Sequence, residues 1–254
     1  MIAPFDASDD PGESDLEGAA RAFEDAPPEQ VLAWAARRWP GRVVLATGFG
    51  AEGCVLVDIV GRLQLPIRIF TLDTGYLFPE TLELWRRLEE RYGLVIEAVR
   101  PAPVADQANV LNGGPLHATD PDRCCFLRKV EPLQRFLAEQ SAWATAIRRD
   151  QSPDRRSARA VERDIRFGLV KLNPLARWSH EDVWEHVRRF DIPTNPLHER
   201  GYVSIGCSPC TSPVSAGEDP RAGRWRGREK TECGLHTTAS ATPLPLDSRP
   251  GDLP

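Results

Sequence analysis

The sequence predicts an α/β fold built on a doubly wound, mostly parallel sheet. Short apolar runs alternate with segments whose apolar residues recur at helical spacing, and this alternation occurs three times before residue 100. Two of the apolar runs end in loops of small residues, at the strand ends where such sheets bind ligands. The chain has 254 residues and is 41% hydrophobic, so it is long enough for one full α/β core.

The first strand–loop–helix unit follows a helix expected over 28–39, which Pro40-Gly41 ends. Residues 42–46 are expected to form a buried strand, 47–53 a loop of small residues, and 54–63 an apolar helix. A strand, a glycine-containing loop and a helix in this order aim backbone N–H groups at a phosphate. The loop has neither the Walker A nor the GxGxxG spacing, so a turn that binds nothing is an equally good interpretation.

Two further units complete the predicted parallel core. A strand at 67–72 leads into 73–75, Pro79 is expected to begin a helix, and the third strand is expected at 94–99. The predicted buried face of that helix comprises Leu82, Trp85, Leu88 and Tyr92. The loops at 47–53 and 73–75 therefore lie at the same edge of the predicted sheet.

The second half of the chain is expected to supply further strands at 143–147 and 167–172. Ser179 and Asp182 have the spacing of a capping box for a helix that Pro193 ends. The other expected elements are a loop at 101–122, a helix at 126–139 that Cys124-Cys125 opens, and a polar, mobile segment at 153–164.

Composition favours a reduced cytoplasmic protein. The net charge is -5, and nothing global suggests a nucleic-acid or membrane partner. The sequence has no apolar run of membrane-spanning length, and its acidic N-terminus does not resemble a signal peptide. A chain of this length does not need a disulfide framework, so its 6 cysteines are expected to be thiols.

Four cysteines are candidates for one metal centre. Cys207 and Cys210, separated by two residues of a tight turn, can direct two thiolates to the same point, and Cys124 and Cys125 would complete the set. Zinc, an iron–sulfur cluster and unrelated buried thiols all remain open on this pattern. The cluster is favoured, because adjacent side chains diverge and a cluster binds its ligands at separate iron atoms. Cys54, in an apolar helix, is interpreted as a core residue.

Cys233 is the candidate nucleophile. The ten residues 221–230 ahead of it include five basic residues, and such surroundings favour the reactive thiolate, although Glu232 opposes the effect. His236 is either a partner of this thiol or a surface residue. Arginines also cluster at 148–166, where Arg148 and Arg149 follow a predicted strand and are expected to bind an anion. The group from Arg155 to Arg166 is interpreted as a solvated helix.

Taken together, these segments resemble the assimilatory adenylyl-sulfate reductases, the cluster-containing branch of the phosphoadenylyl-sulfate/adenylyl-sulfate reductase family. The resemblance extends from about residue 30 to residue 237. The motifs that carry it are Thr47-Gly48-Phe49-Gly50-Ala51-Glu52, Leu72-Asp73-Thr74-Gly75, Arg123-Cys124-Cys125-Phe126-Leu127-Arg128-Lys129-Val130, Arg148-Arg149-Asp150-Gln151-Ser152, Gly206-Cys207-Ser208-Pro209-Cys210 and Glu232-Cys233-Gly234-Leu235-His236.

The resemblance implies a fold of the adenine-nucleotide α-hydrolase-like type and a thioredoxin-dependent reduction of adenylyl sulfate to sulfite and AMP, in sulfate assimilation and cysteine biosynthesis. It implies a [4Fe-4S] cluster on Cys124, Cys125, Cys207 and Cys210, and a thiosulfonate intermediate on Cys233. The implied substrate-binding residues are Thr47, Gly48, Phe49, Gly50, Leu72, Asp73, Thr74, Gly75, Lys129, Arg148, Arg221, Arg224 and His236.

Composition and the extent of the resemblance together predict how the chain is organised. We expect a disordered acidic N-terminus at 1–25, one α/β domain at 26–236 with a catalytic segment at 211–236, and a disordered tail at 237–254. No thioredoxin-like domain follows, so thioredoxin or glutaredoxin is the expected separate electron donor. We further expect a cytoplasmic homo-oligomer without nucleic-acid or membrane partners.

Two positions depart from the family pattern, and the activity has alternatives. Ala146 stands where the family usually has glycine, and Gly53 replaces a common acidic residue. The 3′-phosphorylated substrate is the main alternative to adenylyl sulfate, either alone or as a second substrate. An ATP-pyrophosphatase-type enzyme would need an SGGxDS loop, which 47–53 is not. A zinc-stabilised nucleotide-binding protein with an inert Cys233 is the remaining alternative.

Overall fold

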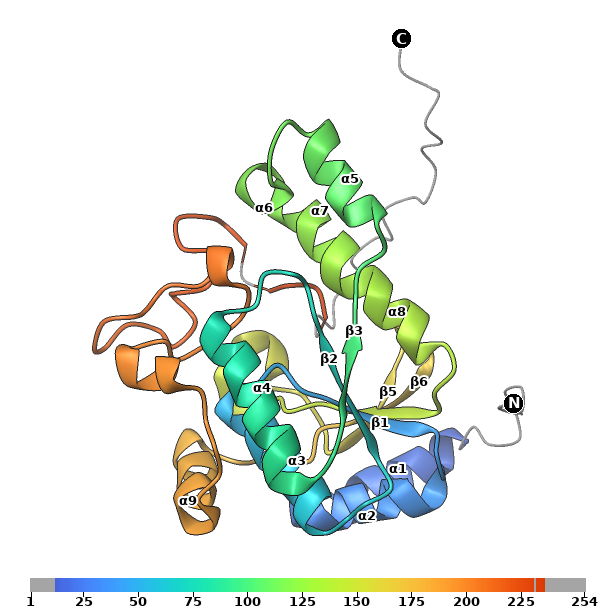
Figure 1. Ribbon diagram of the computed structural model, residues 1–254. Coiled ribbons are helices and arrows are strands. Elements are labelled where there is room, and N and C mark those ends of the chain that lie inside the picture. The colour runs from blue at the N-terminus through green and yellow to red at the C-terminus, as the bar shows by residue number, and fades with distance from the viewer. Residues whose placement is uncertain (1–11, 231, 236–254) are drawn as a thin grey trace.

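The structure, a computed structural model, describes residues 12–230 and 232–235 (Figure 1). In these residues a six-stranded sheet has the order β3-β2-β1-β4-β6-β5. Neighbouring strands are parallel except β5 and β6, which are antiparallel. The strands are β1 (Val43–Ala46), β2 (Arg68–Leu72), β3 (Ile96–Val99), β4 (Ala142–Ala144), β5 (Val161–Asp164) and β6 (Leu169–Leu172). The predicted mostly parallel α/β sheet is confirmed.

The order of the strands places β1 at the centre, between β2 and β4. Leu45 is paired with Ile69 on one side and with Ala144 on the other. The apolar side chains of β1 alternate between two buried layers, with Val43 and Leu45 in one and Val44 in the other. Burial on both faces explains why this strand reads as a continuous apolar run.

Helices cover both faces of the sheet. They are α1 (Glu13–Ala22), α2 (Pro28–Arg38), α3 (Ala51–Arg62), α4 (Pro79–Tyr92), α5 (Val104–Leu111), α6 (Leu116–Thr119), α7 (Pro121–Cys125), α8 (Glu131–Leu137) and α9 (His180–Phe190). The larger core layer contains side chains from α1 to α4 and α9, whereas α8 packs on the opposite face through Leu133 and Leu137. Figure 1 shows α5, α6 and α7 at the end of the molecule opposite α2.

The buried face of α4 differs from the prediction. Leu84 and Leu88 are buried, but Leu82 is 37% exposed. The helix begins with Pro79, as expected, and the set with four-residue spacing that faces the sheet includes Leu84 and Leu88 rather than Leu82. The predicted residues Trp85, Leu88 and Tyr92 do pack against the core, so the prediction is wrong at Leu82, whose place on the buried face is taken by Leu84.

The predicted loop at 101–122 is wrong, because α5, α6 and the start of α7 occupy it. Local side-chain bonds account for these short helices. The Asn109 Oδ1 atom accepts a hydrogen bond from Leu116 N at 2.9 Å, and the Asp120 carboxylate accepts one from Arg123 N at 2.9 Å at the start of α7. A π-helical turn, Phe126–Val130, then joins α7 to α8, so Cys124 and Cys125 end one helix instead of opening another.

The expected disorder over 1–25 is also wrong where the structure describes that region. Helix α1 buries Leu16 and Ala20 against the core, and Glu17 pairs with Arg159 beside β5. The polar segment at 153–164 likewise contains β5, whose backbone pairs with β6. Residues 1–11 and the tail at 237–254 lie outside the described residues. Within the described part of the chain, no helix is long and apolar enough to cross a membrane.

Helix α9 begins at the capping box that the sequence predicts. Asp182 N donates to Ser179 Oγ at 3.1 Å, and Ser179 N donates to the Asp182 carboxylate at 2.7 Å. This reciprocal capping box satisfies two backbone donors that the first turn of a helix leaves unpaired. The helix therefore begins at His180, and one face of it packs on α3 through Val183 and Val187.

Candidate active site

A cavity of about 560 Å³ opens at the carboxyl ends of the central strands. It is the place where a doubly wound sheet binds ligands, because the strand order reverses there. Most of the predicted site residues line it: Thr47, Gly48, Gly50, Leu72, Thr74, Lys129, Arg148, Arg221, Arg224 and Cys233. The fold thus brings together residues from both ends of the sequence.

Three predicted binding residues do not line this cavity. Phe49 is buried, with a left-handed backbone, and its ring stacks on Trp85 at 5.7 Å between ring centroids. The Asp73 carboxylate accepts hydrogen bonds from Gly75 N at 3.2 Å and Arg100 Nε at 3.0 Å. The observed contacts of Phe49, Asp73 and Gly75 shape the two strand-end loops. His236 lies outside the described residues.

The glycine loop is closely packed on the first turn of α3. Helix α3 begins at Ala51, earlier than predicted, so its N-terminal turn borders the cavity. A Cβ atom at Gly53 would lie 2.7 Å from the Thr47 Oγ1 atom. That Oγ1 atom accepts a hydrogen bond from Phe49 N at 3.2 Å. The absence of a side chain at Gly53 therefore fits the local packing of this loop.

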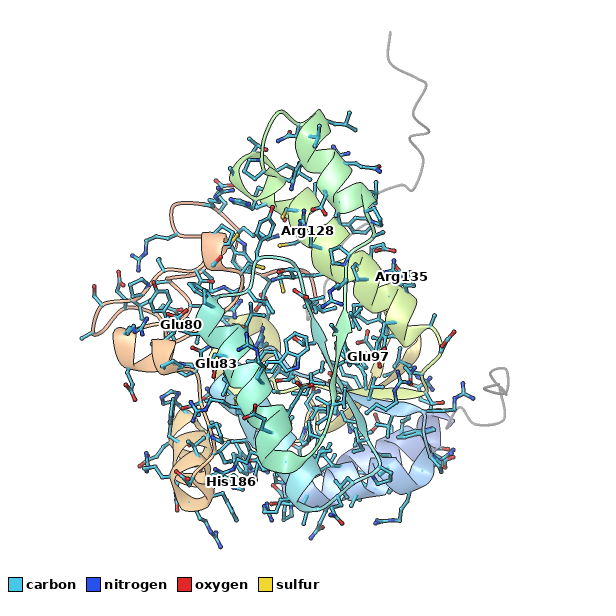
Figure 2. The ribbon with its side chains drawn as sticks, in the orientation of Figure 1. Glu80, Glu83, Glu97, Arg128, Arg135 and His186 are labelled. Atoms are coloured by element: carbon cyan, nitrogen blue, oxygen red, sulfur yellow. The ribbon has the colours of Figure 1, made fainter. Side chains whose placement is uncertain are left out.

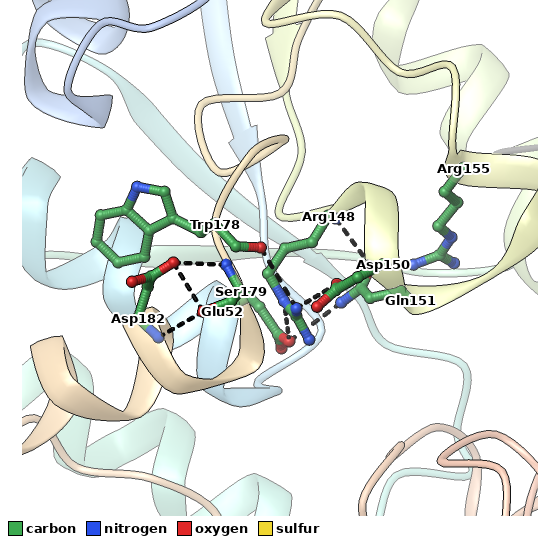
Figure 3. Close-up of polar contacts among 8 residues, drawn as sticks. All are labelled: Glu52, Arg148, Asp150, Gln151, Arg155, Trp178, Ser179 and Asp182. Atoms are coloured by element: carbon green, nitrogen blue, oxygen red, sulfur yellow. Dashed lines mark hydrogen bonds and ion pairs between the residues drawn. The ribbon is translucent and has the colours of Figure 1, made fainter.

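Arg148 is surrounded by acceptors rather than left open to a ligand (Figure 3). Its Nε donates to Glu52 Oε1 at 2.9 Å, and its guanidinium also pairs with Asp150. Gln151 Nε2 donates to the same Glu52 oxygen at 3.1 Å. These bonds tie the glycine loop to the segment after β4. Two carboxylates already neutralise the Arg148 guanidinium, so in this structure the side chain of Arg148 serves to position the glycine loop.

Arg155 enters the site, contrary to the prediction of a solvated helix. Its Nη1 donates to Gln151 Oε1 at 2.6 Å, and its Nη2 lies 3.2 Å from Glu232 Oε1. The side chain is 10% exposed and lines the cavity. The segment cannot form a solvated helix because a three-residue turn, Pro153–Arg155, and then β5 occupy it.

The segment that carries Cys233 is held by contacts on both sides. Glu232 pairs with Arg155 and with Arg221, and Leu235 packs against the core layer around Phe70. Burial alone would raise the pKa of the Cys233 thiol, but the charges of Lys129 and Arg224 together with a backbone hydrogen bond lower it below the usual value. The thiolate form required of a nucleophile is thereby favoured.

A short antiparallel contact fastens the arginines of this segment to the Cys207–Cys210 turn. Thr211 forms a bridge with Arg224, and Trp225 N donates to the Cys210 carbonyl at 3.0 Å. A side chain at Gly206 would overlap the Arg224 guanidinium. The position of Arg224 is thus set by the same turn that presents two of the candidate metal ligands.

The four candidate metal ligands surround one small pocket, separate from the large cavity. It is lined by Cys124, Cys125, Cys207 and Cys210 together with Tyr76, His117, Pro121, Arg128, Lys129, Pro209 and Trp225. The thiols are close enough for charge on one to raise the pKa of another, as Cys207 does for Cys124, Cys125 and Cys210. Burial is the largest influence and raises the pKa of Cys125 to about 12.

Neighbouring side chains hold the walls of this thiol pocket in place. The Thr74 hydroxyl is 3.3 Å from Cys207 Sγ, and Ser208 N donates to the Tyr76 carbonyl at 2.8 Å. Arg128, labelled in Figure 2, donates to the Thr74 carbonyl at 3.1 Å and lies over the Tyr76 ring. The strand-end loop after β2 is therefore part of the pocket wall.

The donor set of the thiol pocket, four cysteine side chains, is chemically suited to an iron–sulfur cluster. In the described residues, no three His, Cys, Asp or Glu side chains gather closely enough to hold one metal ion. The adjacent Cys124 and Cys125 both border the pocket, immediately before the π-helical turn, and such turns are frequent at functional sites. Four thiols around one space are the donor set that iron–sulfur clusters use. Cys54 is fully buried in α3, as expected of a core residue.

Lys129 connects the two pockets, since it lines both. Burial alone would lower its pKa, but the negative charges of Cys207 and Cys233 raise it above the ordinary value. A buried ammonium group therefore stays charged between the thiol pocket and the candidate nucleophile.

Several cavity residues were not predicted. His180, Trp184 and His198 line the cavity from α9 and the turn Pro196–Arg200. The only sequence signal near them is the Ser179 capping box, which identifies a helix end but no site. Their role in the wall follows from tertiary packing of α9 beside α3.

Comparison with known proteins gives one consistent result. The family model of the phosphoadenosine phosphosulfate reductase domain matches residues 42–213. A Gloeobacter violaceus protein named phosphoadenosine 5'-phosphosulfate reductase is 49% identical over 224 residues, covering 87% of this chain and 93% of the relative. An Allochromatium vinosum protein named adenosine 5'-phosphosulfate reductase is 50% identical over 200 residues, covering 76% of this chain and 78% of the relative.

The fold agrees with a solved member. The crystal structure of phosphoadenylyl-sulfate (PAPS) reductase from Candida auris, in a phosphate complex, matches with a TM-score of 0.71 at 27% identity. The match covers 80% of this chain and 98% of that chain. With the strand-end cavity and its cysteines in place, the chain belongs to the phosphoadenosine phosphosulfate reductase family.

Proposed function

We propose that this protein reduces adenylyl sulfate to sulfite and AMP through a thiosulfonate on Cys233, in assimilatory sulfate reduction and cysteine biosynthesis. The observation that carries the proposal is that Cys233 and Lys129 line the strand-end cavity while Lys129 also lines the four-thiol pocket. Relatives named adenosine 5'-phosphosulfate reductase, from Allochromatium vinosum and Bacillus subtilis, support the choice of substrate.

The nucleotide end of the substrate belongs at the glycine loop. Thr47, Gly48 and Gly50 line the cavity beside the N-terminal turn of α3, where backbone N–H groups attract a phosphate. The sulfate end then points towards Lys129, Arg221 and Arg224. These cations face the same cavity as Cys233 and oppose the negative charge that develops on the departing AMP.

The first half-reaction transfers the sulfonate group to the enzyme. The Cys233 thiolate attacks the sulfate sulfur, a sulfur–sulfur bond forms, and the bond from sulfur to the bridging oxygen breaks. The electron pair of that bond leaves with AMP. In the second half-reaction a thiolate of thioredoxin or glutaredoxin attacks Cys233 Sγ and releases sulfite. The second thiol of the donor then forms the donor's disulfide and frees Cys233.

Cys124, Cys125, Cys207 and Cys210 would hold the [4Fe-4S] cluster implied by the family resemblance. When bound, the cluster supplies a fixed negative charge and a rigid anchor for the pocket wall. Lys129 holds its proton between that pocket and Cys233, so it can offer a positive charge to the sulfate group. Thr74 and Arg128 keep the loop after β2 against the thiols.

The proposal also covers the cell compartment, the electron donor and the oligomeric state. Six free thiols in the structure are consistent with a reducing, cytoplasmic environment. A separate dithiol protein is required because the site contains one reactive thiol beside the cluster ligands. We also expect a homo-oligomer and no nucleic-acid or membrane partner.

The test uses protein purified without oxygen and labelled adenylyl sulfate without any thiol. We expect label to remain on the protein, to depend on Cys233, and to leave as sulfite when reduced thioredoxin is added. If intact, brown protein retains no label, the thiosulfonate mechanism is refuted.

The 3′-phosphorylated substrate is the second candidate. The Gloeobacter violaceus relative carries that activity in its name at 49% identity. The same labelling experiment with phosphoadenylyl sulfate, run beside adenylyl sulfate, distinguishes one specificity from the other and from dual specificity. An adenylyl-sulfate reductase should be labelled at much lower concentrations of the unphosphorylated substrate.

A further inference from the structure

Glu232 occupies the space between two arginines of the active site. Its Oε1 atom is 3.2 Å from Arg155 Nη2 and 3.0 Å from Arg221 Nη2. The Glu232 side chain is 5% exposed, and all three residues line the large cavity. A carboxylate therefore fills an anion position immediately beside the proposed nucleophile, Cys233.

The position of the Glu232 carboxylate is unfavourable for the proposed attack of Cys233 on the substrate. A carboxylate next to Cys233 raises the pKa of the thiol and repels an anionic substrate. Without substrate, however, the same carboxylate is needed. Arg155 and Arg221 are close enough for each charge to disfavour the other, and buried like charges require an anion between them.

Arg155 is held from a second direction. Its Nη1 atom donates to Gln151 Oε1 at 2.6 Å, and Gln151 in turn donates to Glu52 at 3.1 Å. Figure 3 shows the Arg155 guanidinium directed towards Gln151. Arg155 would consequently keep its position if Glu232 moved away.

We infer that Glu232 is a resident anion, which holds Arg155 and Arg221 ready for an oxyanion of the substrate and is displaced when that oxyanion binds. The inference rests on the proposed function, because it identifies the displacing group as the sulfate of adenylyl sulfate. Sulfate oxygens pair with guanidinium groups as carboxylate oxygens do. The exchange removes a negative charge from beside Cys233 as the sulfur to be attacked arrives. Glu232 is thus a positioning residue.

The test measures anion affinity in chains that cannot turn over. Cluster-loaded Cys233→Ser protein is compared with the same protein carrying Glu232→Gln, which removes the charge and keeps the shape. Glu229→Gln is the matched control, since Glu229 is an exposed acid on the same segment. Radiolabelled inorganic sulfate and labelled adenylyl sulfate are measured separately by equilibrium dialysis.

We expect Glu232→Gln to bind inorganic sulfate and adenylyl sulfate at least about tenfold more tightly than the parent, because no ion pair has to be broken. Glu229→Gln should stay within about twofold, as exposed charges contribute little. A merely structural role for Glu232 would weaken binding. Unchanged or weaker sulfate binding in Glu232→Gln overturns the inference.

Two arms keep the outcomes separate. If Glu232→Gln fails to fold, Glu232→Asp retains the charge at a shorter reach, and it should bind sulfate more tightly than the parent. Sulfate binding that does not tighten in that variant also overturns the inference. If sulfate binding tightens but adenylyl sulfate binds to none of the proteins, the proposed function fails while the resident-anion role stands.

Discussion

Replacing Gly53 by alanine tests the packing of the glycine loop. Whether the replacement lowers or raises the free energy of unfolding should depend on one atom, Thr47 Oγ1. A Cβ at this position would lie 2.7 Å from Thr47 Oγ1, and its other nearest neighbours are at 3.7 Å. The contact with Oγ1 is therefore the single severe overlap. Overpacking of this kind typically costs about 1–3 kcal/mol.

An opposite contribution comes from the helix. Gly53 lies in the first turn of α3, and alanine stabilises a helix by about 0.5–1 kcal/mol relative to glycine. We therefore expect Gly53→Ala to lower the free energy of unfolding by about 1–2 kcal/mol in the natural chain. In a Thr47→Ala background the overlap is absent, and Gly53→Ala should raise the free energy of unfolding by up to about 1 kcal/mol.

The assay is urea unfolding of the four proteins of this double-mutant cycle, loaded with the same cluster content. Thr47→Ala alone removes the hydrogen bond to Phe49 N, so it also supplies the reference for that loss. The reasoning is refuted if Gly53→Ala has the same effect in both backgrounds, because the overlap with Oγ1 would then contribute nothing.

Three further predictions follow from other parts of the structure. Cys207→Ser should lose iron and brown colour, whereas Cys54→Ser should keep both, and iron analysis with visible absorption checks this; retained iron in the first variant contradicts its ligand role. Burial favours a protonated Asp58, but His186 (Figure 2), whose Nε2 lies 3.8 Å from the carboxylate, and hydrogen bonds from Tyr92 and Arg62 lower the pKa of Asp58 below its ordinary value. The stability that Asp58 contributes is then present above a pH of about 4 and is lost as the pH falls through the lowered pKa, so the difference in unfolding free energy between wild type and Asp58→Asn should shrink in acid. A difference that is constant with pH would contradict that linkage. Leu84→Ala should cost about 2–5 kcal/mol and Leu82→Ala less than about 0.5 kcal/mol, measured by urea unfolding; equal costs would show that the buried face is misassigned.

The central sheet and the cysteine pattern were predictable because their signals are local. Strand β1 is a continuous apolar run followed by small residues, and this is what burial on both faces requires. The Cys207–Cys210 spacing likewise specifies a turn that carries two thiols. Both features need no knowledge of distant partners.

Other features depend on contacts that the local pattern does not display. Helices α5 and α6 flank a Gly113-Gly114 pair that indicates a loop, yet Asn109 bonds across the turn to Leu116 N. Arg155 lies at the cavity through contacts with Gln151 and with Glu232, a residue far away in the sequence. A run of charges between residues 153 and 164 gives no sign of that partner.

The Thr211–Arg224 bridge has a consequence for how the protein is handled in the laboratory. It joins the cysteine turn to an arginine of the cavity, and the absence of a side chain at Gly206 leaves the space that the Arg224 guanidinium occupies. If the four thiols hold the proposed cluster, a loss of iron that loosened Cys207 would therefore also misplace Arg224. A preparation with partial metal content would then contain some molecules that bind the substrate and some that do not. Titration with a nucleotide would measure the fraction of molecules that carry the metal.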